Sequence, residues 1–336
     1  MKLAILAPVA WRTPPRHYGP WEQVASTICE GIVQKGLDVT LFATLDSQTQ
    51  GRHEGIIGKG YEEDPESDGL VSTCMHISYL MEMADQFDLI HNHFDYLPLT
   101  YSRLIKTPMV TTIHGFSSSK IWPVFERYNG FTHYVSISYA DRLNTLDYVG
   151  NVYNGIQVDD FTFCDQPEDY LLFFGRIHPH KGAFEAIQIA KKAKRKLVIS
   201  GIIQDQTYFD EKVKPLIDDE QIVFVGSSGP EKRDQLLGKA MALLHPISFD
   251  EPFGLSVAES MFCGTPVIAF NRGSMPELIK HNQTGFLVSN VDDAVAVVND
   301  TRLISRSYCR SHAMSNFSSQ RMVEGYYDVY QKIIKY

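Results

Sequence analysis

The sequence predicts an α/β fold built from two doubly wound domains in tandem. The chain has 336 residues, which is too long for one ordinary hydrophobic core. Short apolar runs alternate with amphipathic segments, as in a parallel sheet covered by helices on both faces. This rhythm restarts near Tyr170, after a polar segment at residues 157–169 that we interpret as the linker between the domains.

The first half of the chain contains apolar runs that we expect to form strands, separated by helix-like stretches. The expected strands are residues 3–7, 38–43, 87–91, 109–114 and 132–138, and the expected helices are residues 21–34, 71–85, 98–105 and 140–146. The runs are apolar almost throughout, and strands of that composition are buried on both faces. Residues 1–160 are therefore expected to form one Rossmann-like domain.

The second half repeats the pattern and then adds a helix. The expected strands are residues 170–175, 196–201, 221–226, 242–245, 266–270 and 285–288, and the expected helices are residues 183–193, 208–217, 231–239, 255–262 and 292–305. These elements predict a second Rossmann-like domain at residues 168–317. In residues 318–336, apolar side chains recur at helical spacing: Met322, Tyr326, Val329 and Ile333.

The composition excludes several classes of protein. Hydrophobic residues make up 44% of the chain and charged residues 21%, as in a globular protein. No apolar run approaches the roughly 20 residues of a membrane span, and the apolar run at the N-terminus is broken by Pro8. The five cysteines are scattered without a C-x-x-C pair, which favours a reducing, cytoplasmic location over a disulfide framework or a zinc cage. The net charge of −9 disfavours nucleic acid as a partner.

The most informative stretch is residues 245–269, which contains Glu251 and Glu259 with seven residues between them. It is expected to run from strand to acidic loop to helix, and Pro252 and Gly254 favour a helix start near Leu255. Both carboxylates can then face one cleft beside the unpaired N–H groups of the helix start. The backbone N–H groups expected to bind an anion are those of Phe253, Gly254 and Leu255.

This Glu pair, with Phe-Gly after the first Glu and Gly-Thr-Pro-Val-Ile after the second, resembles the retaining glycosyltransferases of family 4, the group 1 glycosyl transferases. The resemblance implies a GT-B fold, in which two Rossmann-like domains face each other across a cleft and the C-terminal helix crosses back to the N-terminal domain. It also implies that Glu251 contacts the transferred sugar and Glu259 holds the ribose hydroxyls. A surface helix with two solvated acids is the structural alternative.

A second motif supports the resemblance. Residues 175–182 match the family pattern Gly-Arg-x-x-x-x-Lys-Gly, with Arg176 and Lys181 as its cations. A rigid guanidinium fork and a mobile ammonium can together hold two phosphates and stabilise a leaving diphosphate. As in the family, no catalytic metal is then expected. His178 and His180 suggest zinc, but no third ligand has suitable spacing.

Histidines follow two strands of the first half. The resemblance places His114, in the segment Thr-Thr-Ile-His-Gly, against the donor sugar, although a structural histidine at the end of a strand is the alternative. We expect His91 and His93 to point to opposite faces of the sheet, which would be poor geometry for a shared metal. Asp95 is expected on the following loop, where a contact with the acceptor and a purely structural role are equally open.

Two further loops correspond to family segments that surround the substrates. The loop at residues 7–25 corresponds to the Gly-Gly-x-Glu loop of the family, but a single Gly19 is followed by Pro20, so fewer amides can reach an anion. Aromatic and guanidinium groups of this loop suit sugars or phosphates, and the candidates are Trp11 and Arg16. The loop after residue 224 corresponds to the region beside the nucleobase and makes Val225 a candidate base contact.

Together with these features, the resemblance implies a retaining, metal-independent hexosyltransferase. The donor is expected to be a nucleoside-diphosphate sugar, UDP-glucose before GDP-mannose, and the acceptor a sugar or another small hydroxylated molecule. No cofactor is expected beyond this co-substrate, and contact with a membrane only if the acceptor is a lipid. A non-hydrolysing sugar-nucleotide epimerase of the same fold and a catalytically silent sugar-nucleotide-binding protein are the alternatives. The absence of G-x-G-x-x-G and P-loop motifs disfavours NAD and P-loop functions.

Overall fold

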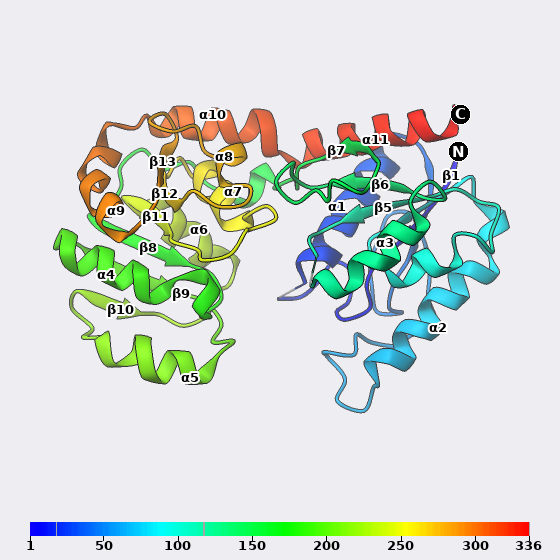
Figure 1. Ribbon diagram of the computed structural model, residues 1–336, viewed down its shortest axis with the longest axis horizontal. Coiled ribbons are helices and arrows are strands. Elements are labelled where there is room, and N and C mark those ends of the chain that lie inside the picture. Colours follow the sequence, from blue (N-terminus) through cyan, green and yellow to red (C-terminus); the bar gives the residue numbers. More distant parts are fainter. Residues whose placement is uncertain (18, 117, 336) are drawn as a thin grey trace. The chain divides into compact units, whose positions relative to one another are not determined.

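The computed structural model describes residues 1–17, 19–116 and 118–335, and the chain divides into two compact units. The first unit comprises Met1–Gly155 together with the segment from Ser319 to the C-terminus, and the second comprises Ile156–Ser318. Residue Tyr336, the end of the predicted C-terminal helix, lies outside the described residues. Each unit is a parallel sheet flanked by helices (Figure 1). The predicted two-domain α/β architecture is therefore confirmed.

The described part of the first unit contains a seven-stranded parallel sheet in the order β3-β2-β1-β4-β5-β6-β7. The strands are β1 (Lys2–Leu6), β2 (Asp38–Phe42), β3 (Arg52–Glu54), β4 (Leu89–Asn92), β5 (Met109–Ile113), β6 (His133–Ser136) and β7 (Tyr148–Asn151). The strand order reverses direction between β1 and β4. Ligands of open α/β sheets bind beyond the carboxyl ends of the strands at such a switch point.

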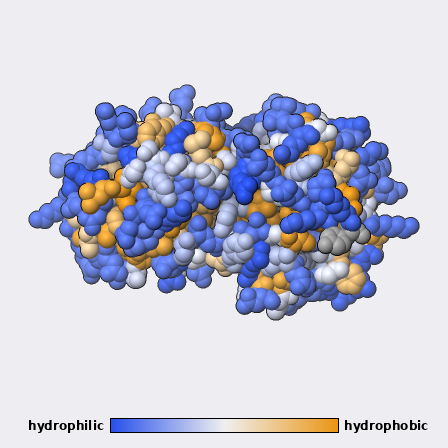
Figure 2. All heavy atoms as spheres, turned by 90° about the horizontal axis from the view of Figure 1, so that it is seen from above, coloured by the Kyte–Doolittle hydropathy of each residue, from blue (hydrophilic) through white to orange (hydrophobic). Residues whose placement is uncertain are grey.

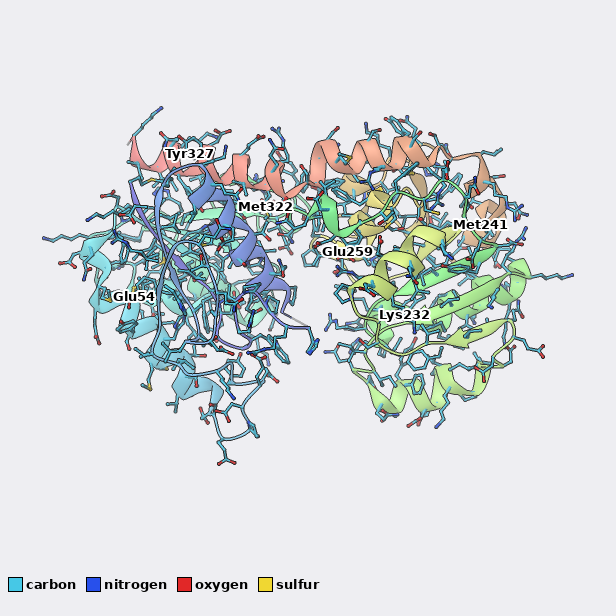
Figure 3. All side chains as sticks on the ribbon, turned by 180° about the vertical axis from the view of Figure 1, so that it is seen from behind. Glu54, Lys232, Met241, Glu259, Met322 and Tyr327 are labelled. Atoms are coloured by element: carbon cyan, nitrogen blue, oxygen red, sulfur yellow. The ribbon has the colours of Figure 1, made fainter. Side chains whose placement is uncertain are left out.

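Helices cover both faces of this sheet: α1 (Pro20–Gln34), α2 (Gly69–Glu82), α3 (Trp122–Tyr128) and α11 (Ser319–Ile334). Helix α11 comes from the far end of the sequence and packs along α1 (Figure 1). The four apolar positions predicted from its helical spacing are all buried, and Met322 and Tyr327 mark its course in Figure 3. The end of the chain is thus part of the core of the first unit.

The described second unit contains a six-stranded parallel sheet in the order β10-β9-β8-β11-β12-β13, with its switch point between β8 and β11. The strands are β8 (Tyr170–Phe174), β9 (Lys196–Ser200), β10 (Ile222–Phe224), β11 (Ala242–His245), β12 (Val267–Phe270) and β13 (Gly285–Val288). The helices are α4 (Ala183–Ala193), α5 (Gln206–Tyr208), α6 (Pro230–Lys239), α7 (Leu255–Phe262), α8 (Met275–Leu278), α9 (Val291–Val297) and α10 (Arg306–Phe317).

One predicted helix is wrong. Residues 140–146 form turns instead, because side chains bind the local backbone and so replace helical hydrogen bonds. The Ser138 hydroxyl accepts from the N–H of Asp141 at 3.2 Å, and the Tyr148 hydroxyl accepts from the N–H of Leu143 at 3.1 Å. The Arg142 guanidinium lies over the Tyr148 ring, 4.7 Å from its centroid, and holds the turns against β7.

Other predicted helices are shorter or irregular. Residues 208–217 form α5, a π turn η6 (Phe209–Val213) and a 3₁₀ turn η7 (Lys214–Leu216), where Pro215 removes a backbone donor. Residues 98–105 contain only the 3₁₀ helix η2 (Leu97–Tyr101), and residues 292–305 divide into α9 and η8 (Asn299–Leu303). Strands β3 and β7 and helices α3, α8 and α10 have no counterpart among the predicted elements. Smaller 3₁₀ turns are η1 (Ala84–Gln86), η3 (Ser119–Ile121), η4 (Val158–Asp160) and η5 (Pro179–Lys181).

The surface is mainly hydrophilic on the face drawn in Figure 2, where hydrophobic side chains form small scattered patches. Among the described residues, no helix is both long enough and apolar enough to cross a membrane. The five cysteines are all free, and three of them, Cys29, Cys263 and Cys309, are buried.

The contact between α1 and α11 depends on the absence of a side chain at Gly31. A Cβ atom there would lie 2.3 Å from Cγ2 of Val323 on α11. We predict that Gly31→Ala lowers the free energy of unfolding of the first unit by about 1–2 kcal/mol, because overpacking outweighs the better helix propensity of alanine. Denaturant unfolding followed by circular dichroism measures this change.

The matched control is Gly58→Ala, because a Cβ at Gly58 meets no atom within 4 Å. The double variant Gly31→Ala/Val323→Ala should be less destabilised than the sum of the single variants, since the shortened Val323 makes room. A Gly31→Ala protein as stable as the wild type would contradict the proposed close approach.

Candidate functional site

In the second unit, a buried ion pair lies at the switch point of the sheet. Lys181 follows β8 and Glu251 follows β11, and Lys181 Nζ donates a short hydrogen bond to Glu251 Oε2. Their side chains are only 14% and 12% exposed. His245, the last residue of β11, places Nε2 3.6 Å from the same carboxylate oxygen. The structure thus brings two predicted residues together and adds a histidine that the sequence did not single out.

The charges of this cluster follow from its surroundings. Burial opposes ionisation of Glu251 and is the largest single effect, but His245 and Lys181 together outweigh it and lower the pKa of Glu251 to about 2. Burial also lowers the pKa of His245, so its imidazole is neutral near pH 7. Lys181 is therefore the cation that balances the Glu251 carboxylate at that pH.

Tight backbone contacts hold the two loops in place. The N–H of Ser248 donates to the carbonyl of His180 at 2.9 Å, which joins the loop after β8 to the loop after β11. Gly182 adopts a left-handed conformation with φ 79°, and a Cβ there would lie 2.1 Å from the carbonyl oxygen of Pro246. The glycine after Lys181 is thus required by the close approach of the second loop.

Helix α7 begins at Leu255, as the sequence predicts, and Gly254 precedes it in a left-handed conformation. Among the residues that the structure describes, none caps this end of the helix with its side chain. A Cβ at Gly254 would lie 3.7 Å from Cγ of Glu251, so the helix start is next to the ion pair. Phe253 is buried, and its carbonyl accepts from the Ser274 hydroxyl at 2.7 Å. The first-turn N–H groups and the helix dipole favour an anion here.

Glu259 lies inside α7 (Figure 3), and the described structure records no contact between it and Glu251. Instead, Arg233 Nη1 lies 3.3 Å from Glu259 Oε1. Burial raises the pKa of Glu259, while Arg233 opposes that shift. The Arg233 guanidinium also lies over the ring of Phe161, 4.9 Å from its centroid. The sequence did not reveal Arg233, since α6 carries several exposed charges and none is distinguished by spacing.

Arg176 follows β8 and Val225 follows β10 at the carboxyl edge of the same sheet, where β9 lies between these two strands. Arg176, after β8, donates from Nη1 to Gln204 Oε1 at 2.7 Å. Val225, after β10, donates its N–H to Ile199 at 3.0 Å, and its carbonyl oxygen lies 3.5 Å from Lys232 Nζ. Arg176 and Lys181 therefore bind different partners in this state, a carboxamide and a carboxylate.

In the first unit, His114 belongs to a row of buried histidines. His93 Nδ1 lies 3.0 Å from His114 Nε2, and His93 Nε2 lies 3.2 Å from His91 Nδ1. The expectation that His91 and His93 point to opposite faces is wrong, because residues two apart in a strand share one face. Their ring centroids are 4.0 Å apart. Trp21 stacks on the His114 ring, and the centroids of these two rings are 5.3 Å apart.

The loop between β1 and α1 is arranged around a buried acid. Gly19 is the buried N-cap of α1, and the Glu22 carboxylate accepts the N–H of Trp11 at 3.3 Å. Burial raises the pKa of Glu22 to about 7. Glu22 stands at the Glu position of the family's Gly-Gly-x-Glu loop, so the motif itself was the signal that could have identified it.

Two other predicted residues of the first unit have defined surroundings. Arg16 forms ion pairs with Asp46 at 2.9 Å and with Glu63 at 2.8 Å, so its charge is already balanced within the protein. Asp95 has a left-handed φ of 67°, its carbonyl accepts from Asn92 Nδ2 at 2.8 Å, and burial raises the pKa of its carboxyl to about 7.

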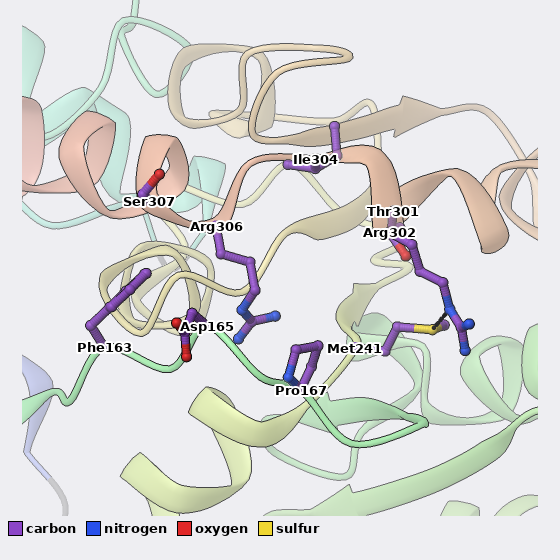
Figure 4. A pocket seen from close by; sticks show the side chains of 9 residues that line it. All are labelled: Phe163, Asp165, Pro167, Met241, Thr301, Arg302, Ile304, Arg306 and Ser307. Atoms are coloured by element: carbon purple, nitrogen blue, oxygen red, sulfur yellow. Dashed lines mark hydrogen bonds between the residues drawn. The ribbon is translucent and has the colours of Figure 1, made fainter.

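The described structure offers no candidate metal site, and the arginines of a pocket beside β11 are already paired. No group of three His, Cys, Asp or Glu side chains suited to a metal ion occurs among the residues that the structure describes. A pocket lined by Arg302, Arg306 and Met241 lies beside the start of β11 (Figure 4). Arg302 pairs with Asp169, and Arg306 donates to three carbonyls and to Thr265, so both arginines serve the fold.

Similarity to known proteins agrees with this geometry. The model of the glycosyltransferase family 4 matches residues 22–159, and the model of the glycosyl transferases group 1 matches residues 160–320. An uncharacterized glycosyltransferase of Methanocaldococcus jannaschii is 25% identical over 86% of this chain and 85% of its own length.

Solved glycosyltransferase structures share the fold over almost the whole chain. Sucrose-phosphate synthase of Thermosynechococcus elongatus has a TM-score of 0.81 at 15% identity and covers 100% of this chain and 99% of its own. The Anabaena protein HepE, solved with UDP and glucose, has a TM-score of 0.74 at 19% identity and covers 99% and 100%. The chain therefore belongs to the group 1 and family 4 glycosyltransferases and has the GT-B fold.

Proposed function

We propose that this glycosyltransferase moves a hexose from a nucleoside-diphosphate sugar to a hydroxyl of a sugar or another small acceptor, with retention of configuration. The observation that carries this proposal is the buried Lys181–Glu251 pair at the switch point, beside the start of α7. This arrangement combines a cation that can bind a phosphate, a carboxylate that can accept from hydroxyls and a helix start that favours an anion. A sugar diphosphate needs all three.

UDP-glucose is the preferred donor candidate, and GDP-mannose is the next. The structural relative HepE has been solved with UDP and also with UDP-glucose, which supports a uridine donor by analogy. Val225 and the loop after β10 are proposed to border the base. The five free cysteines support a reducing compartment such as the cytoplasm.

Lys181 and Arg176 are proposed to hold the diphosphate. When the bond between the sugar and the phosphate breaks, negative charge grows on the phosphate oxygen, and fixed cations stabilise that state more than the ground state. The amides of Phe253, Gly254 and Leu255, at the start of α7, are proposed to add positive dipoles at the same place. With these groups in position, no metal is needed to neutralise the leaving group.

Glu251 and Glu259 are proposed to bind hydroxyl groups. An ionised carboxylate only accepts hydrogen bonds, and the low pKa of Glu251 keeps it ionised near pH 7. It suits the hydroxyls of the transferred sugar. Glu259, with Arg233 at 3.3 Å, suits the two ribose hydroxyls.

The acceptor is proposed to attack from the face of the sugar that the diphosphate leaves. The acceptor oxygen bonds to the anomeric carbon, the bond from that carbon to the phosphate oxygen breaks, and a phosphate oxygen takes the acceptor proton. His114 contributes to positioning the sugar. In the first unit, Gly19, Trp11, Arg16 and Asp95 lie on loops proposed to serve the acceptor.

The first prediction concerns Lys181. We expect Lys181→Gln to lower kcat/KM with UDP-glucose by about 100-fold or more, equivalent to about 3 kcal/mol, because the leaving diphosphate loses a cation. Glutamine retains an N–H donor for Glu251, so folding is less affected than by alanine. A coupled assay of UDP release measures the rate.

The control is Lys192→Gln, since Lys192 forms an exposed ion pair with Asp292 in the same unit. Turnover of Lys181→Gln within a few-fold of the wild type would refute the diphosphate role. UDP release must also require an acceptor, because an epimerase releases no free nucleoside diphosphate and a silent binding protein turns over nothing.

The second prediction concerns Glu259. We expect Glu259→Gln to weaken UDP binding by about 10-fold or more, because hydrogen bonds from the ribose to a charged carboxylate are replaced by weaker ones. Isothermal titration calorimetry measures the affinity, and thermal unfolding checks the fold. Glu168→Gln, which alters an exposed pair with Lys239, is the control. Unchanged UDP affinity of Glu259→Gln would count against ribose binding.

The third prediction concerns metal dependence. Because Lys181, Arg176 and the α7 amides already supply positive charge for the diphosphate, we expect activity to persist after EDTA treatment and dialysis. The rate is compared with and without added Mg²⁺ or Mn²⁺. Complete loss of activity, restored by a divalent ion, would overturn the proposal that the protein alone neutralises the leaving group.

A further inference from the structure

One buried polar atom beside the ion pair of the second unit lacks a hydrogen-bond partner. The side chain of His245, the last residue of β11, is 6% exposed, and its Nε2 atom lies 3.6 Å from Glu251 Oε2. The same oxygen accepts the short hydrogen bond from Lys181 Nζ. A distance of 3.6 Å is too long for an N–H···O hydrogen bond, and this nitrogen has no partner among the residues that the structure describes. Such a buried atom calls for an explanation.

The carboxylate of Glu251 determines which form of the His245 ring is favourable. Burial lowers the pKa of His245 and outweighs the opposite effect of Glu251, so the ring is neutral near pH 7. A neutral imidazole has one nitrogen that carries a proton and one that carries a lone pair. Because Glu251 is ionised, with a pKa of about 2, a lone pair on Nε2 would face a negative charge. His245 therefore carries its proton on Nε2, as a donor directed at the carboxylate.

The backbones of both residues are held firmly. Strand β11 keeps His245 in register opposite Ala269 of β12. The carbonyl of Glu251 accepts from the N–H of Ser274 at 2.9 Å, and a Cβ at Gly273 would lie 2.4 Å from the backbone nitrogen of Glu251. The pair can therefore close by side-chain movement alone. A shift of about 0.6 Å brings Glu251 Oε2 to the usual distance of about 3.0 Å from an N–H donor.

Lys181 is the partner of Glu251 that a diphosphate competes for. Its ammonium stands at the end of a flexible stem with rotatable donors, and hydrogen bonds between such a cation and a phosphate are strong. Under the proposed function, a bound diphosphate draws Lys181 toward its own oxygens and weakens the hydrogen bond to Glu251. A buried carboxylate that loses its partner is costly, so another donor is needed at the same oxygen.

We propose that His245 is a positioning residue that holds Glu251 in place when a diphosphate draws Lys181 toward itself, by donating from Nε2 to Glu251 Oε2. The other carboxylate oxygen then remains available for a hydroxyl of the transferred sugar. The identity of the ligand rests on the proposed function, but the pairing of His245 with Glu251 does not. His245 thus acts through Glu251 and needs no contact of its own with the substrate.

The first test is the tautomer of His245 in the full-length wild-type protein without ligand. Nitrogen-15 NMR of histidine-labelled protein distinguishes a protonated from an unprotonated ring nitrogen, and the signal that is lost in His245→Gln belongs to His245. We expect Nε2 to be protonated and Nδ1 to be unprotonated at pH 7. A His245 signal with the proton on Nδ1 overturns the proposal, whatever the protein does as an enzyme.

Lys181→Met tests the exchange of partners without any ligand. Methionine has a stem of similar length but no charge and no N–H donor, so Glu251 has to take its hydrogen bond from His245. We expect the proton on His245 Nε2 to move downfield relative to the wild type, because that hydrogen bond becomes stronger. Lys192→Met, which removes one partner of the exposed pair with Asp292, is the control and should leave the signal unchanged. An unchanged signal in Lys181→Met refutes the exchange.

A cycle of binding measurements tests the role of His245 with the donor candidate. In calorimetry without acceptor, we expect His245→Leu to weaken UDP-glucose binding by about 10-fold or more, because Glu251 loses the donor that holds it. In a Glu251→Gln background the same change should alter the affinity by less than about twofold, since no carboxylate remains to be held. His245→Gln, whose amide still donates, should stay within about threefold of the wild type. Equal losses in both backgrounds would mean that His245 only packs the strand.

These measurements separate the inference from the proposed function. If the wild type does not bind UDP-glucose but His245 is protonated on Nε2 and responds to Lys181→Met, the donor assignment fails and the pairing of His245 with Glu251 stands. If UDP-glucose binds but His245→Leu causes the same loss in both backgrounds, the donor assignment stands and the role of His245 is refuted. Should Lys181→Met not fold, the wild-type tautomer and the binding cycle still decide.

Discussion

The loops at the switch point of the second unit are organised around one interaction, the largely buried ion pair between Lys181 and Glu251. Removing two charges from water is costly, and loss of one partner of such a pair costs about 3–5 kcal/mol. The fold supports the pair with close backbone contacts, including Gly182 against Pro246 and Ser274, whose N–H donates to the Glu251 carbonyl at 2.9 Å. The loops that carry the pair are thus fixed before any ligand arrives.

Under the proposed function, a diphosphate would bind beside cations that are already paired within the protein. Lys181 is balanced by Glu251, Arg233 by Glu259, and Arg176 is held by Gln204. An incoming diphosphate would share Lys181 with Glu251 rather than meet a bare charge, and sugar hydroxyls would satisfy the carboxylate in return. Charge and hydroxyl recognition are therefore coupled in a single ligand, which is a physical reason for selectivity between a sugar nucleotide and free phosphate.

The sequence predicts regular elements and motif residues better than it predicts contacts. Helix α7 begins where Pro252 and Gly254 indicate, because these residues act locally. The turns at residues 140–146 depend on hydrogen bonds to Tyr148 and Ser138. Arg233 and Glu22 become candidate site residues only when their partners, Glu259 and Trp11, are known from the structure. To predict the row formed by His91, His93 and His114, one needs the side-chain directions at the end of β4 and the position of the neighbouring strand β5. The contact between His91 and Tyr330 spans 239 positions of the sequence.

Both units have a switch point in a parallel sheet, but they carry different side chains there. Each has side chains that follow the strands at its switch point, but the second unit gathers charges and the first gathers neutral imidazoles. Charges suit a diphosphate, whose negative charge grows as it leaves. Burial lowers the pKa of His91, His93 and His114, so these three imidazoles are uncharged near pH 7.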